Sequence, residues 1–163
     1  IIDQVEQLEK ELADDIINGT NKAVVPKGLV CTDNIITNIG LTESAKRDSG
    51  EVSSTLTHNS IGTGTTTPTV SDTDLQTEDT GGSYARLGYA ASGQRKVSNQ
   101  TGKYGMLWDD SKVSAVPISI TESGVHWNVS TGNTMHARVT FTAFSMTTGD
   151  LFVTQINELH QNG

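Results

Sequence analysis

The pattern of apolar and polar positions changes along the chain, from a helical period at the start to a period of two after residue 50. In residues 1–18 an apolar side chain recurs every three or four positions, and Asn18-Gly19 supplies a stop. We therefore predict a helix over residues 1–19. Its polar outer faces favour a short coiled-coil stalk, and packing on the following domain is the alternative. The stripe that would form the oligomer interface consists of Ile1, Val5, Leu8, Leu12 and Ile16.

Residues 20–32 predict an extended linker, because Pro26 and Gly28 interrupt any regular pattern. Residues 33–48 predict a short helix that Asp33 or Asn34 would cap. Its buried side would include Ile35, Ile36 and Ile39.

The clearest strand pattern is "NTMHARVTFTAF" (133–144), where apolar and polar side chains alternate. Met135, Ala137 and Val139 would face one way. His136 and Arg138 would face the other, and we expect His136 to be solvated. The last strand, 151–156, follows the turn Thr148-Gly149-Asp150 and is apolar on both faces.

Other short segments with strand character are separated by turns every eight to twelve residues. They predict an all-β fold for residues 33–163, an antiparallel β-sandwich of the jelly-roll type. "SDTDLQTE" (71–78) predicts one helical turn. The further predicted strands are 53–61, 84–91, 94–99, 104–108, 113–121 and 125–129, with 84–91 and 94–99 expected to form a pair.

Composition narrows the function classes. The 163 residues carry a net charge of -8, and the basic residues are scattered, so we expect no nucleic-acid partner. No apolar run approaches the ~20 residues of a membrane helix, so we expect no membrane partner. The single cysteine, Cys31, excludes an intrachain disulfide and leaves a buried thiol or an interchain disulfide between copies.

The threonine-rich stretch "NSIGTGTTTPTVSDTDLQTE" (59–78) fails the tests for a ligand loop. No lysine follows Gly64, as a phosphate-binding P-loop requires, and Thr67-Pro68 breaks a dinucleotide fingerprint. Asp72 and Asp74 have a metal-like spacing, but the loop lacks the glycine and the bidentate glutamate of a calcium loop. We therefore expect no cofactor and no metal here.

Enzyme signatures are also weak. The four histidines have no zinc spacing, and no GxSxG elbow is present. Glu122 with Asp109 or Asp110 is the one suggestion of a paired carboxylate site. We expect no enzymatic activity, and we interpret these acids as turn residues. The histidines are His58, His126, His136 and His160.

Two segments together resemble a known family. Residues 34–78 and 118–156 are similar to tailed-phage and prophage virion proteins described as tail-fibre, tail-collar or phage structural proteins. Residues 83–114 show no match to the family pattern. The matching residues are Ile61, Gly62, Gly64, Pro68, Asp72, Thr73, Leu75, Glu78, Thr121, Glu122, Gly124, Arg138, Phe141, Gly149 and Asp150.

The resemblance implies that the threonine-rich stretch is a loop between strands, with Leu75 as its anchor and no ligand. It also implies that Glu122 holds backbone amides at a strand end, beside a conformationally permissive Gly124. The implied function is structural, as a tail-fibre or attachment protein or a capsid-surface decoration. The implied location is the virion, as a homotrimer among other tail, baseplate or capsid proteins.

A host surface glycan is a further candidate partner. Exposed aromatic side chains would form its binding face, and burial of the same side chains in the core is the alternative. A second functional class also fits the sequence, a bacterial surface β-sandwich that binds carbohydrate. The candidate ligand-face residues are Tyr84, Tyr89, Tyr104, Trp108 and Trp127.

Overall fold

A computed structural model describes residues 32–51, 55–81, 86–89, 93–98, 101–129 and 132–159. The predicted stalk helix, with its stripe of Ile1, Val5, Leu8, Leu12 and Ile16, lies outside these residues, as do residues 20–31 of the linker, Cys31 and Tyr84. Among the described residues no helix is long and apolar enough to cross a membrane.

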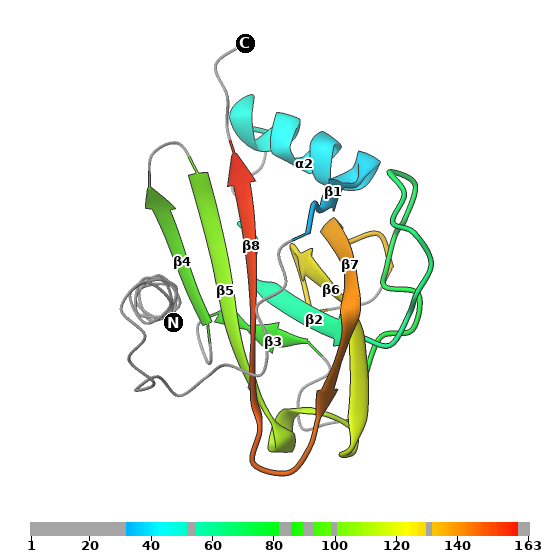
Figure 1. Ribbon diagram of the computed structural model, residues 1–163. Helices are drawn as coiled ribbons and strands as arrows, with labels where there is room; N and C mark the ends of the chain where they lie inside the picture. The colour runs from blue at the N-terminus through cyan, green and yellow to red at the C-terminus, as the bar shows by residue number, and fades with distance from the viewer. Residues whose placement is uncertain are drawn as a thin grey trace, which may run out of the picture.

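The described chain is built from two antiparallel β-sheets, which confirms the all-β prediction (Figure 1). One sheet has five strands in the order β1-β7-β6-β2-β3, and the other has three in the order β4-β5-β8. The first comprises β1 (Ile35–Ile36), β7 (Met135–Met146), β6 (Ile118–His126), β2 (His58–Gly62) and β3 (Leu87–Gly88). The second comprises β4 (Gly93–Ser98), β5 (Thr101–Asp109) and β8 (Leu151–Leu159).

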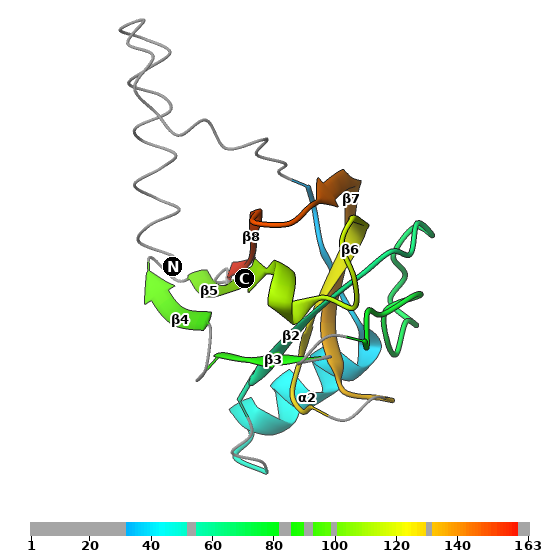
Figure 2. The same cartoon turned by 90° about the horizontal axis from the view of Figure 1, so that it is seen from below.

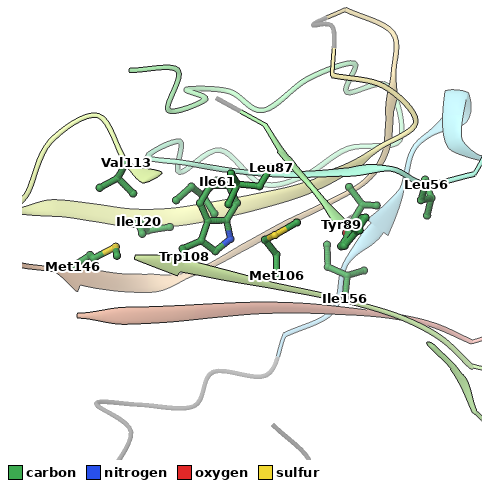
Figure 3. Close-up of a cluster of buried hydrophobic side chains, with 11 residues drawn as sticks. Leu56, Ile61, Leu87, Tyr89, Met106, Trp108, Val113, Ile120, Met146 and Ile156 are labelled. Atoms are coloured by element: carbon green, nitrogen blue, oxygen red, sulfur yellow. The ribbon is translucent and has the colours of Figure 1, made fainter. Parts of the chain in front are cut away.

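The main apolar core lies between the two sheets (Figure 3). The three-stranded sheet contributes Met106, Trp108 and Ile156, and the five-stranded sheet contributes side chains such as Ile61 and Ile120. All are at most 5% exposed. Burial of these side chains is the main favourable term that holds the two sheets together.

A short polar link crosses the same core. The indole Nε1 of Trp108 donates to Thr154 Oγ1 at 3.2 Å, and Thr154 Oγ1 donates to Asn59 Oδ1 at 3.1 Å. Ser123 Oγ donates to the same oxygen of Asn59 at 3.3 Å. Because Trp108 and Thr154 belong to one sheet and Asn59 and Ser123 to the other, the link fixes how the sheets face each other.

The single helix of more than one turn, among the described residues, is α2 (Asn38–Asp48), which packs against β7. It begins later than the predicted 33–48 because Ile35 and Ile36 pair with Ala137 and Arg138 of β7 instead. The helix cap is therefore Thr37, whose hydroxyl accepts from Gly40 N at 3.0 Å, and neither Asp33 nor Asn34.

His136 was expected to be solvated, and that prediction is wrong. Its side chain is 2% exposed. A Cβ on Gly40 of α2 would collide with the His136 backbone, so the helix lies directly on this strand. The ring also meets Trp127 edge-on, with centroids 5.3 Å apart. Strand alternation alone could not show that a helix covers the polar face of β7.

Several strand limits also differ from the predictions. The segments 113–121 and 125–129 were predicted separately, but one continuous strand, β6, runs from Ile118 to His126. A 3-10 helix η1 (Asp110–Lys112) occupies the preceding turn. Residues 71–78 contain turns and no helix. The predicted pair of 84–91 with 94–99 is not formed, because β3 pairs with β2 and β4 pairs with β5.

Candidate functional site

The most organised polar region lies where the loop 63–81 covers the five-stranded sheet on the face opposite the main core. Figures 1 and 2 show this loop beside β6 and β7. It contains the threonine-rich stretch, and its backbone has few bonds of the sheet type: Gly62 forms a bridge with Glu78, and Thr63 N donates to Thr77 O at 2.9 Å. The remaining polar groups of the loop therefore need partners from the sheet.

Glu122 of β6 supplies those partners. Its side chain is 0% exposed. Oε1 accepts from Gly64 N at 3.0 Å and from Thr77 N at 2.8 Å, and Oε2 accepts from Gln76 N at 3.1 Å. One carboxylate thus binds amides from both arms of the loop, as expected from the sequence, although Glu122 lies within β6 and not at a strand end.

Arg138 of β7 neutralises this carboxylate and reaches the tip of the loop. It is 2% exposed, and its Nε donates to Glu122 Oε2 at 3.0 Å. Its Nη1 donates to Asp72 Oδ2 at 2.6 Å, and its Nη2 donates to Thr66 O at 3.2 Å. Burial alone would raise the pKa of Asp72, but bonds from Thr69 and Arg138 hold that pKa below its usual value.

Arg86, directly before β3, anchors the other arm of the loop. It is 3% exposed and donates from Nε and Nη2 to the two oxygens of Glu78, each at 2.8 Å. Nη2 also donates to Asp74 Oδ1, and Nη1 donates to Thr134 Oγ1, both at 2.8 Å. Asp74 in turn accepts from Gly132 N at 3.0 Å. We call Glu122, Arg138, Asp72, Arg86, Asp74 and Glu78 the loop latch.

Two glycines make this close packing possible. A Cβ on Gly64 would lie 2.5 Å from Glu122 Oε1 and 2.6 Å from the Cβ of Gln76, so a side chain there would displace the carboxylate. A Cβ on Gly124 would lie 3.1 Å from Leu75 Cδ2, and Leu75 itself is 6% exposed. Leu75 therefore packs over Gly124 and anchors the loop, as the resemblance implied.

The charged groups of the loop latch are bonded to one another or to loop amides. Both arginines are engaged, and Glu122 is out of contact with solvent. Asp109 binds Ser111 and Lys112, while Asp110 accepts from Gly149 N at 3.0 Å, so neither acid is engaged with Glu122. Within the described ranges no group of three or more His, Cys, Asp or Glu side chains could hold a metal ion.

A second polar pair resembles a nucleophile with its base. Ser60 Oγ and His126 Nε2 are 2.6 Å apart, but both residues are 0% exposed, so no substrate can reach them. Among the described residues no group bonds to the Nδ1 of His126, whereas a catalytic base is oriented by a third group there. Burial lowers the pKa of His126 well below its usual value, and the nearby Arg86 and His58 lower it further.

Two of the five predicted ligand-face residues are buried in the core. Trp108 is 1% exposed and Tyr89 is 4% exposed, and both belong to the core between the sheets. Tyr104 and Trp127 are partly buried against that core. The guanidinium of Arg47 lies 5.4 Å from the centre of the Trp127 ring and covers part of it. The prediction of a ligand face is therefore wrong for Trp108 and Tyr89.

Part of the loop latch can be recognised from the sequence. Glu122, Asp72 and Arg138 stand among the residues that carry the family resemblance, and Arg138 lies in a strongly patterned strand. Arg86 carries no such signal, because its partners Asp74 and Glu78 lie in a loop whose position depends on the tertiary fold.

In comparisons with known proteins, the chain matches no family model, no curated protein and no solved structure.

Proposed function

We propose that this chain is a non-enzymatic structural protein of a phage-type virion, serving as a tail-fibre or attachment protein or as a capsid-surface decoration. Its two sheets would form a jelly-roll-like sandwich on a coiled-coil stalk made from residues 1–19. The chain would assemble as a homotrimer and contact other virion proteins.

One observation carries the proposal: residues that carry the family resemblance come from two segments far apart in the sequence, and they contact one another in and around the loop latch. Gly64 and Asp72 come from the first segment, and Glu122 and Arg138 come from the second. A motif whose members fix a loop on a sheet preserves architecture and requires no substrate. That role suits a family of building blocks better than a family of enzymes.

The alternative, a bacterial carbohydrate-binding module, has less support. Such modules present aromatic rings to the sugar. Here Trp108 and Tyr89 are in the core, and Arg47 lies over Trp127. A glycan array with the full chain separates an attachment protein, which should bind a glycan, from a capsid-surface decoration, which should not.

The stalk is tested by measuring mass in solution with light scattering, on the full chain and on a variant lacking residues 1–18. We expect a trimer that becomes a monomer on truncation. Two full-length double variants make the test more specific. The first, Leu8→Glu with Leu12→Glu, places charge in the apolar stripe. The second, Glu6→Gln with Glu9→Gln, changes only the outer faces and is the control. Only the first double variant should dissociate the trimer, and a monomer in every sample contradicts the proposal.

The absence of enzymatic function is tested with Glu122→Gln. We expect this variant to lose folding stability, because the amide cannot accept three backbone bonds and neutralise Arg138 at once. A variant that folds normally, and that loses a hydrolytic activity present in the wild-type protein, would overturn the assignment.

A further inference from the structure

We propose that His58, His126 and Arg86 form an acid-sensitive lock on the β3 edge of the five-stranded sheet. In neutral solution the lock holds β3 against β2. When the two imidazoles take up protons, two positive charges are added beside the buried guanidinium of Arg86, and β3 detaches before the rest of the sheet.

The sheet register brings the two histidines together. His58 of β2 and His126 of β6 are direct partners in the antiparallel ladder, so their side chains lie on the same face of the sheet. Directly opposite side chains have Cβ atoms about 4.5–5.5 Å apart. His58 is also the register partner of Gly88 in β3, and a Cβ on Gly88 would lie 3.5 Å from its Nε2.

The contacts of His126 suit a neutral ring. Nε2 lies 2.6 Å from Ser60 Oγ, which satisfies one ring nitrogen. Nδ1 is buried, and no described residue bonds to it. A protonated imidazole carries two N–H donors, so protonation would leave a buried donor without an acceptor in addition to a buried charge.

The carboxylates nearest to the pair are bonded to arginines, and no described carboxylate is hydrogen-bonded to either histidine. The buried guanidinium of Arg86 lies at the start of β3, and Glu78 and Asp74 are already bonded to it. Further along the sheet, Glu122 and Arg138 pair with each other. On the α2 side, Arg47 lies over Trp127, the residue after His126. Burial and then Arg86 lower the pKa of His58, as they do for His126.

The β3 edge is the part of the sheet that acid would release first. It has two residues, and it is held to β2 by the register pairs His58–Gly88 and Asn59–Leu87. One further bond runs from Tyr89 N to Thr57 O at 2.9 Å. Arg86 precedes this strand directly, so detachment of β3 would also withdraw Arg86 from the loop latch.

The direction of the pH effect follows from the protonation states. A histidine whose pKa is lowered in the fold binds fewer protons than it does in the unfolded chain, where its pKa is about 6.5. Its contribution to stability is complete above that pH and is lost as the pH falls toward the folded pKa. For the fully buried His126, the unfolding equilibrium constant should rise by up to about tenfold per pH unit in this window, and the rise should be smaller for the half-buried His58.

The test uses urea unfolding of the full chain between pH 7.5 and 5, with His126→Gln, His58→Gln and the matched control His160→Gln. In the wild-type protein the unfolding equilibrium constant should rise as the pH falls. We expect this rise to be smaller in the first two variants, by up to about tenfold per pH unit, and unchanged in the control. If the unfolding equilibrium constant of His126→Gln depends on pH as steeply as that of the wild-type protein, the proposal is overturned.

A second measurement works on the unmodified protein and does not depend on a variant that folds. The imidazole C2–H resonance of His126 should show no protonation in the native state near pH 6.5. Hydrogen-exchange protection at Leu87 and Tyr89 should fall in mild acid before protection in β6 and β7 does. Native-state protonation of His126 near pH 6.5, or simultaneous loss of protection in all strands, would contradict the lock.

Discussion

The two faces of the five-stranded sheet are both buried, but by opposite means. The face toward the three-stranded sheet is mostly apolar, with Ile61 and Ile120 among its side chains and Asn59 and Ser123 as its polar part. On the other face, under the loop 63–81, the same strands present Glu122 and Arg138 with almost no exposure. Strand β6, for example, contributes Ile120 to the apolar core on one side and Glu122 to the charged latch on the other.

The difference follows from what covers each face. The other sheet satisfies its own backbone groups through strand pairing, so the contact with it is mainly apolar. An irregular loop cannot do this, and its buried amides need acceptors from outside the loop. Glu122 provides them, and Arg138 makes burial of that carboxylate tolerable. Four predictions test this comparison.

The largest effect should come from Arg138→Met. The variant removes the positive partner and leaves Glu122 and Asp72 facing each other without it. Breaking a buried ion pair by removing one partner costs about 3–5 kcal/mol of unfolding free energy. Urea unfolding at pH 7 measures it. A loss below about 1 kcal/mol would show that water reaches the carboxylates and that the latch is not a true core.

Gly64→Ala should have the next largest effect. The new methyl group would overlap the Glu122 carboxylate and Gln76, and overpacking of this kind costs about 1–3 kcal/mol. Gly88→Ala is the matched control, because its Cβ would meet His58 at an ordinary 3.5 Å. The thermal unfolding midpoints of the two variants are compared. Equal midpoints would mean that the loop shifts freely on the sheet.

Ile120→Val tests the apolar face and should cost about 0.5–1.5 kcal/mol, since it removes one buried methylene without removing a polar partner. Urea unfolding of this variant gives the reference for a core made of hydrocarbon. A larger loss than that of Arg138→Met would reverse the comparison between the two faces.

The smallest effect should come from Glu43→Gln on α2. Glu43 binds Lys46 at 2.8 Å, as Glu122 binds Arg138, but the pair is open to solvent. Exposed ion pairs of this type contribute little and are screened by salt. The unfolding midpoint should match the wild-type protein within error at 0.15 M salt, and a clear loss would show that burial is not what distinguishes the latch.

Local pattern was sufficient for the elements whose environment is set by their neighbours in sequence. The alternation in residues 134–144 predicted β7, and the segments 94–99 and 104–108 correspond closely to β4 and β5. Local pattern failed at Ile35 and Ile36, which it predicts at the start of a helix and which form β1 instead. Their pairing with β7, about a hundred positions later, overrides local helix propensity.

The candidate site divides in the same way. The resemblance marked Glu122, Gly124 and Leu75, and the role of Glu122 as an acceptor of backbone amides was correct. Pattern could not pair Glu122 with Arg138 or Arg86 with Glu78, since each pair joins different elements of the fold. It also could not decide whether Trp108 faces solvent or the second sheet.

An all-β domain and several residues that its loop requires follow from the amino-acid sequence alone, because strand period and glycine placement are local properties of the chain. Which side of each strand is buried, which charges pair, and that His58 and His126 lie opposite each other depend on the folded arrangement. Those outcomes depend on the order of strands in the two sheets, and burial and charge pairing act between segments far apart in the chain.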